Sequence, residues 1–147
     1  MTVEKRVLCL KMASGITIAT GLFMAVAAIP ELAGPTVVFV DLVFWPFDGM
    51  QSLDAPEARL LTAVTGGVLV GWAALIWMVA TQVYSSDPAL GRRLILTSLM
   101  NWFVIDSSMS VAAGAPLNVV GNLFFLALFV LPILSSPTGS ARATDIA

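Results

Sequence analysis

The polar residues that could do chemistry within the long apolar stretches of this chain centre on Asp106. An acid near the middle of a membrane-spanning helix costs roughly 2.5 to 3.5 kcal/mol on insertion scales, so such residues face other helices and have partners. Asn118 and Asn122 are one helical turn apart at the start of the next apolar run and can offer amide groups. Arg59 begins an earlier run and can offer a positive charge. We expect these four side chains to meet.

Further acidic and aromatic side chains precede Arg59. Asp41 and Trp45 are four residues apart and share a face if that segment is helical, which would place the indole at the level of lipid headgroups. Asp48 and Gly49 are typical of a tight turn. Asp54 is expected to cap the helix that follows. The candidate cluster, either ligand-binding or structural, therefore comprises Arg59, Asp106, Asn118, Asn122, Asp41, Trp45, Asp48 and Asp54.

Three kinds of chemistry fit this cluster. In the first, Arg59 neutralises Asp106 and the asparagines satisfy the remaining hydrogen bonds, which fastens the helices together. In the second, carboxylates and amides bind a polar headgroup or small molecule above an apolar floor of Trp102, Phe125 and Phe129. In the third, Asp106 acts as an acid or base together with Asp41 or Asp48.

Absent residue types exclude several functions. The chain has no histidine, which removes the commonest metal ligand and the usual axial ligand of haem. Its single cysteine, Cys9, can form neither an internal disulfide nor a redox pair. Its only lysines are Lys5 and Lys11, so it has no phosphate-binding loop of the GxxxxGK type. We expect no cofactor, no metal site, no catalytic residue of known type and no nucleic-acid partner.

The elements that must position these residues are apolar helices. The chain has 147 residues, of which 59% are apolar and 11% charged. About 20 apolar residues cross a membrane as a helix, and four such runs occur at about 7–29, 58–83, 94–113 and 117–134. The sequence predicts an all-α membrane protein, a four-transmembrane-helix bundle forming one domain over residues 1–134. Segment 36–47 is too short to cross and is expected to be re-entrant or interfacial.

The sequences at the two ends of the chain allow two further predictions. The first run is longer than a secretory signal core and ends in Pro30 at a poor cleavage site, so we expect a retained helix. The tail 135–147 is rich in Ser, Thr and Ala, and we expect it to be flexible and cytoplasmic.

Basic residues indicate the orientation, because Lys and Arg in short loops stay on the cytoplasmic side. Six of the seven basic residues fall on one side of the expected bundle, namely Lys5, Arg6, Lys11, Arg92, Arg93 and Arg142. Arg59 is the seventh and lies on the other side. Both termini are therefore expected to be cytoplasmic in a bacterial inner membrane.

Small residues are expected at helix contacts. Gly21 belongs to a stripe of small residues at steps of four, and Gly67 and Gly71 form a GxxxG spacing. Small residues let helix backbones approach closely in lipid. We expect packing at Gly21, Gly67 and Gly71, either within the bundle or in a homo-oligomer.

The run Asp41-x-x-x-Trp45-Pro46-x-Asp48-Gly49, followed by Asp54, Arg59 and Gly66-Gly67-x-x-x-Gly71-Trp72, resembles a set of short bacterial inner-membrane proteins of unknown function. Some of these are labelled as an excinuclease subunit, but such a subunit needs phosphate loops and zinc-binding cysteines that this chain lacks. The four-span layout is broadly similar to that of DoxX-like proteins, at the level of fold analogy. The resemblance implies architecture and placement and no activity.

Three classes of function follow. A non-enzymatic membrane protein, acting as an accessory subunit or as a binder of lipid or a small apolar molecule through the outer cluster, fits best. A small proton-coupled transporter is the first alternative. An intramembrane enzyme using Asp106 is the second. Expected partners are membrane lipids, a further copy of the chain or a larger membrane complex.

Overall fold

The computed structural model describes residues 1–135, and within this range the chain is helical without strands. Its elements are α1 (Val3–Ala25), the short 3-10 turns η1 (Val26–Ala28) and η2 (Pro30–Leu32), α2 (Gly34–Phe44), α3 (Pro56–Met78), the π-helical η3 (Val79–Tyr84), α4 (Pro88–Ala112) and α5 (Asn118–Leu134). Arg142 and nearly all of the expected tail 135–147 lie outside the described residues.

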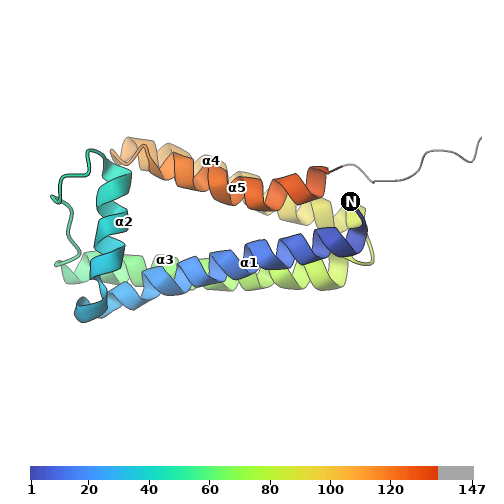
Figure 1. Ribbon diagram of the computed structural model, residues 1–147, viewed down its shortest axis with the longest axis horizontal. Helices are drawn as coiled ribbons and strands as arrows, with labels where there is room; N and C mark the ends of the chain where they lie inside the picture. The colour runs from blue at the N-terminus through green and yellow to red at the C-terminus, as the bar shows by residue number, and fades with distance from the viewer. Residues whose placement is uncertain (136–147) are drawn as a thin grey trace, which may run out of the picture.

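Four long helices form two antiparallel pairs, α1 with α3 and α4 with α5 (Figure 1). The pairs meet at the end where α1 begins and α5 finishes, which we call the narrow end. They diverge toward the opposite, wide end, where α2 lies across the space between them (Figure 1). A hydrogen bond from Arg6 Nη2 to the carbonyl of Ser135 joins the start of α1 to the end of α5 at the narrow end. The overall shape is a wedge with α2 across its wide end.

The buried apolar core fills the narrow end. It consists of side chains from all four long helices and from η3, namely Leu10, Ala13, Ile76, Ala80, Tyr84, Ile95, Leu99, Phe129 and Ile133. A second, smaller cluster of Ala27, Ala33 and Leu53 packs at the corner where α1 turns into α2. The hydroxyl of Thr36 donates to the carbonyl of Phe23 at 3.3 Å and ties α2 to α1 at the same corner. Between the two clusters the helix pairs are apart.

Local sequence explains where the helices begin. Asp87 caps α4 by accepting the backbone amides of Ala89 and Leu90 at 3.1 and 3.0 Å, and Pro88 occupies the first helical position. The helix therefore begins well before residue 94, where the apolar run suggested its start.

One expected helix cap is wrong. The N-cap of α3 is Ala55, which makes no side-chain cap hydrogen bond, while the Asp54 side chain is exposed. Pro56 at the first helical position starts the helix instead, since its ring presets the backbone angle that a helix needs.

Two glycines create the tightest contact between α1 and α3. A Cβ on Gly66 would lie 2.4 Å from the carbonyl oxygen of Gly21, and a Cβ on Gly21 would lie 2.7 Å from that of Gly66. No atom of the described chain lies within 4 Å of the Cβ positions of Gly67 and Gly71. Gly21 therefore packs inside the molecule as a small residue must, and its partner is Gly66, whereas the Gly67–Gly71 spacing faces outward.

Three helical stretches are long and apolar enough to cross a membrane, namely Val3–Ala28, Pro56–Tyr84 and Pro88–Ala112. The helix α5, with 17 residues, and α2, with 11, are shorter apolar helices. Large apolar side chains cover the outside of the long helices, and Leu61, Ile105 and Leu131 each expose more than 60% of their surface. Large exposed apolar surfaces are typical of proteins that meet lipid or other proteins.

Candidate ligand-binding cavity

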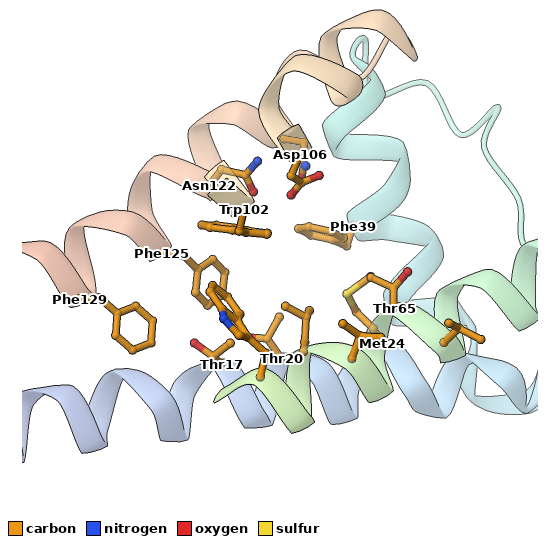
Figure 2. Close-up of a pocket in the computed structure, with 15 residues that line it drawn as sticks. Thr17, Thr20, Met24, Phe39, Thr65, Trp102, Asp106, Asn122, Phe125 and Phe129 are labelled. Atoms are coloured by element: carbon orange, nitrogen blue, oxygen red, sulfur yellow. The ribbon is translucent and has the colours of Figure 1, made fainter. Parts of the chain in front are cut away.

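A cavity of about 500 Å³ lies between the two helix pairs (Figure 2). All five helices line it. Its aromatic walls are formed by Phe39, Trp72, Trp102, Phe125 and Phe129. Its polar lining residues are Thr17, Thr20, Thr65, Asp106, Asn118 and Asn122. Asp106 and the asparagines lie on the α4 and α5 side, facing the threonines of α1 and α3 (Figure 2).

Hydrogen bonds between α4 and α5 organise the polar side. Ser110 Oγ donates to Asp106 Oδ1 at 3.4 Å, and Asn118 Nδ2 donates to Ser110 Oγ at 2.9 Å. One turn deeper, Asn122 Nδ2 donates to Ser107 Oγ at 3.1 Å in a buried position. Because the serine oxygens accept from the amide nitrogens, the amide oxygens of both asparagines remain without a hydrogen bond within residues 1–135. Two serine–asparagine pairs thus join the helices and leave acceptors at the cavity.

Two tryptophans form a fixed aromatic wall. The ring centroids of Trp72 and Trp102 are 5.4 Å apart with an angle of 43° between their planes. Trp72 Nε1 donates to Ser98 Oγ at 2.6 Å, which holds the indole of α3 against α4. Trp102 also meets Phe103 edge-on at 6.4 Å. Trp72 is half-buried with its N–H satisfied, so its indole is held in place and presents a fixed apolar surface to the cavity.

The acidic residues of the loop between α2 and α3 are used to fold that loop. Asp41 is 3% exposed, and both of its carboxylate oxygens accept the backbone amide of Gly49, at 3.1 and 3.0 Å. Asp48 Oδ1 accepts the amide of Met50 at 3.1 Å, as expected for a turn. Trp45 follows the last residue of α2 and is 63% exposed. These residues are absent from the cavity lining.

Arg59 makes local contacts, and the expected pairing with Asp106 does not form. Its Nη1 donates to the carbonyl oxygens of Leu53 and Asp54 at 2.9 and 2.7 Å. Within residues 1–135 it has no ion pair with Asp106, Asp54 or Glu57. A guanidinium has donors in a fixed fork and can bind adjacent backbone carbonyls that the chain brings to it. We call Arg59, Asp41 and Asp48, with the backbone that they bind, the loop clasp.

The structure therefore divides the expected cluster in two. It brings Asp106, Asn118 and Asn122 together at the cavity, and it places Arg59, Asp41, Trp45, Asp48 and Asp54 in or beside the loop between α2 and α3. Trp102, Phe125 and Phe129, expected as an apolar floor, line the cavity.

Several lining residues could not be assigned to a cavity from the sequence. Phe39 reaches it from α2, and Thr17 and Thr20 reach it from α1. Their periodicity shows which residues share a helix face but not what that face meets. The position of Trp72 in the sequence did indicate such a role, because a tryptophan deep within an apolar run suggests packing between helices or a cavity wall.

No protein-family model, curated protein or solved structure matches this chain.

Proposed function

We propose that this protein is a non-enzymatic, four-span membrane protein that binds an amphiphilic small molecule or lipid in the cavity between its helix pairs. The observation that carries the proposal is the cavity itself, with aromatic walls and with Asp106, Asn118 and Asn122 gathered on one side. Its volume of about 500 Å³ falls within the range of roughly 300–1,000 Å³ that is typical of small-molecule sites.

Four crossings are supported by the antiparallel arrangement. α5 has 17 residues, which is the lower limit of the roughly 17–25 residues that span a bilayer. It runs back along α4 from the wide end to the narrow end (Figure 1). The segment α2 lies across the wide end, which supports an interfacial or re-entrant role. The bacterial inner membrane, with both termini cytoplasmic, is the setting that we propose from the charge distribution.

An enzyme is supported less well. Asp41 and Asp48, the acid/base partners considered for Asp106, are engaged by loop amides and do not line the cavity. A general acid or base must come within hydrogen-bond reach of the proton that it moves.

A small transporter is the second candidate, and the wedge shape favours it. Two helix pairs that meet at one end and diverge at the other could rock about the narrow end. This function would require the cavity to open toward the narrow end in a second state.

The proposal is tested by native mass spectrometry of the protein released from membranes in mild detergent. We expect a retained amphiphile on the unaltered protein and at least severalfold lower occupancy in Thr20→Phe, since Thr20 lines the cavity and a phenyl ring would fill part of it. Thr97→Phe is the matched control, because Thr97 is an exposed residue of α4 outside the lining. Equal occupancy in the two folded variants, or no retained molecule at all, would contradict the proposal.

A further inference from the structure

One lining residue of the cavity has an ionisable side chain, and this side chain is an acid. Among the lining residues Asp106 is the only ionisable acid, and neither lysine nor arginine accompanies it. Within residues 1–135 no ion pair involves Asp106, and its one hydrogen bond comes from Ser110 at 3.4 Å. A carboxylate facing an apolar space without a countercharge favours any ligand that brings a positive charge.

The hydrogen-bonding groups of the lining point to the same preference. The hydroxyls of Thr17, Thr20 and Thr65 donate to carbonyls of their own helices at 2.9, 3.0 and 2.8 Å. The indole N–H of Trp72 is taken by Ser98. The lining donors that remain are Trp102 Nε1 and the second hydrogen of each asparagine amide.

Acceptors, by contrast, remain on the polar side of the cavity. The amide oxygens of Asn118 and Asn122 have no hydrogen bond within residues 1–135, because each amide nitrogen is the group bound to serine. Both asparagines line the same cavity as Asp106, and Asn118 is linked to Asp106 through Ser110, so the lining offers acceptors to a donor head. This arrangement suits a group that has hydrogens to give and a positive charge.

Aromatic rings in the lining also favour a cationic ligand. Trp102 and Phe39 lie next to Asp106 in the cavity (Figure 2), and Trp72, whose ring centroid is 5.4 Å from that of Trp102, lines the same cavity together with Phe125. The negative face of an aromatic ring attracts a cation, and this attraction grows when water is excluded. Aromatic rings around an acid form a site for an alkylammonium or similar organic cation, whose carbon substituents also gain from the apolar walls.

We propose that the cavity is selective for amphiphiles with a cationic head, of the alkylammonium class, with Asp106 as the countercharge and the paired tryptophans as the wall. This inference rests on the proposed function, since it names the ligand class of the same cavity. An anionic amphiphile of the same size is disfavoured, because its charge would approach Asp106 in a medium of low dielectric constant. Neutral amphiphiles bind between these two limits.

The selectivity is tested with two amphiphiles of equal chain length and opposite charge, decylammonium and decyl sulfate. Each is titrated into the protein in nanodiscs of zwitterionic lipid, with empty nanodiscs as the blank, by calorimetry and tryptophan fluorescence. We expect saturable binding of the cation, at least about tenfold tighter than that of the anion, as charge pairing and cation–π attraction together would give. Equal affinity, or preference for the anion, overturns the inference, and this comparison needs no variant.

Variants then assign the preference to Asp106. Asp106→Asn is expected to weaken binding of the cation by about tenfold while leaving the melting temperature within a few degrees, because asparagine can still accept from Ser110. Asp106→Glu keeps the charge and is expected to retain the preference. Asp54→Asn removes an exposed acid at the same end of the molecule, outside the lining, and is expected to change nothing. An unchanged cation affinity in folded Asp106→Asn overturns the inference.

Failure of the inference is distinguishable from failure of the proposed function. If neither ion binds while Thr20→Phe still depletes a retained molecule, the cavity binds ligands of another class and only the charge selectivity is overturned. If neither ion binds and no molecule is retained, both are overturned.

Discussion

Two charged side chains at the wide end have separate roles, although their types suggest a pair. Arg59 binds the carbonyls of Leu53 and Asp54, and Asp106 faces the cavity with a single hydrogen bond from Ser110. Arg59 forms both of its Nη1 hydrogen bonds at little cost in chain entropy, since the two carbonyls are only five and six residues away. Asp106 therefore faces the cavity without an ion pair within residues 1–135.

The separate roles of Arg59 and Asp106 predict that Arg59→Met affects the loop and not the cavity. The variant keeps an apolar stem and loses both hydrogen bonds to the carbonyls, so we expect it to destabilise the loop clasp by about 1 to 2 kcal/mol. Amide hydrogen exchange over residues 48–58 should accelerate, while binding at the cavity should stay within about twofold, since Arg59 is not a lining residue and its hydrogen bonds go to the loop. Mass-spectrometric hydrogen exchange and calorimetry in nanodiscs measure the two effects.

Arg93→Met is the matched control, because it removes an exposed arginine of α4 at the narrow end. Exchange in the loop between α2 and α3 should not change in this variant. A loss of cavity binding in Arg59→Met with an unperturbed loop would contradict the division and would favour the expected pairing with Asp106.

Residue periodicity predicted the cavity side of the cluster better than it predicted the loop. Asn118, Asn122, Phe125 and Phe129 share one stripe of a helix by spacing alone, and all four line the cavity. Arg59 has a long side chain whose reach includes many acceptors, so spacing could not choose between Asp106 and nearby carbonyls. The choice depends on the path of the loop, which no periodicity describes.

At the scale of elements, the contact between α1 and α3 depends on which of two adjacent glycines faces inward. Gly66 meets the backbone of Gly21 and Ala25, whereas Gly67 has open space. The GxxxG spacing favoured Gly67 and Gly71 in the sequence, but a shift of one residue turns a helix face by about 100°. The GxxxG spacing does not indicate which face of α3 packs against α1. The three-dimensional structure was needed to show that Gly66, and not Gly67, lies in this contact.

The two glycines therefore predict opposite outcomes for the same substitution. Gly66→Ala places a Cβ 2.4 Å from the Gly21 carbonyl oxygen and 2.6 Å from the Ala25 nitrogen. The helices must move apart, and we expect a loss of about 1 to 3 kcal/mol in unfolding free energy. Gly67→Ala meets nothing within 4 Å and should be neutral or slightly stabilising, because alanine favours a helix. Thermal or denaturant unfolding in detergent measures both.

A destabilised Gly67→Ala with an unaffected Gly66→Ala would contradict this register of α1 against α3. It would instead indicate that the Gly67–Gly71 face is the one that packs. Comparing adjacent positions in one helix keeps the substitution and its helix propensity the same in the two variants, so the difference between them reports packing.

Helix extents show a similar limit of sequence patterns. Hydropathy located four apolar runs, but α4 begins at Pro88, where Asp87 caps it, and α3 continues into the π-helical η3 as far as Tyr84. Hydropathy reports where lipid contact is favourable, and capping reports where the backbone becomes helical. The two signals differ where a helix extends past the apolar run into the polar boundary.

At the scale of the whole molecule, the basic side chains within residues 1–135 other than Arg59 gather at the narrow end, where Glu4 and Asp87 also lie. Lys5, Arg6, Arg92 and Arg93 lie where α1 and α4 begin, at the narrow end, whereas the acidic loop lies at the wide end (Figure 1). Lys11 is also near the narrow end and rests over the Trp77 ring at 5.0 Å from its centroid. In the orientation that we propose from the bias of Lys and Arg in short loops, the narrow end faces the cytoplasm and the wide end faces outward. In that orientation the cavity lies toward the outer leaflet.

Single cysteines test both the orientation and the number of crossings. Starting from Cys9→Ala, which removes the only cysteine, we expect Gln51→Cys and Ala113→Cys to react with a membrane-impermeant maleimide in intact spheroplasts, because both lie at the wide end. Ser86→Cys, between η3 and α4 at the narrow end, should react only after the membrane is opened. These three positions alone give the orientation of α3 and α4.

The position that decides the number of crossings is Ser135→Cys, at the end of α5. If the 17-residue α5 crosses, Ser135→Cys must behave like Ser86→Cys, since Arg6 already holds the Ser135 carbonyl at the narrow end. If it reacts in intact spheroplasts together with Gln51→Cys, α5 does not cross and the four-span proposal is wrong. The cavity would then lack a wall in the membrane, since Asn118, Asn122, Phe125 and Phe129 all come from α5. Labelling at residue 135 thus tests the architecture on which the binding site depends.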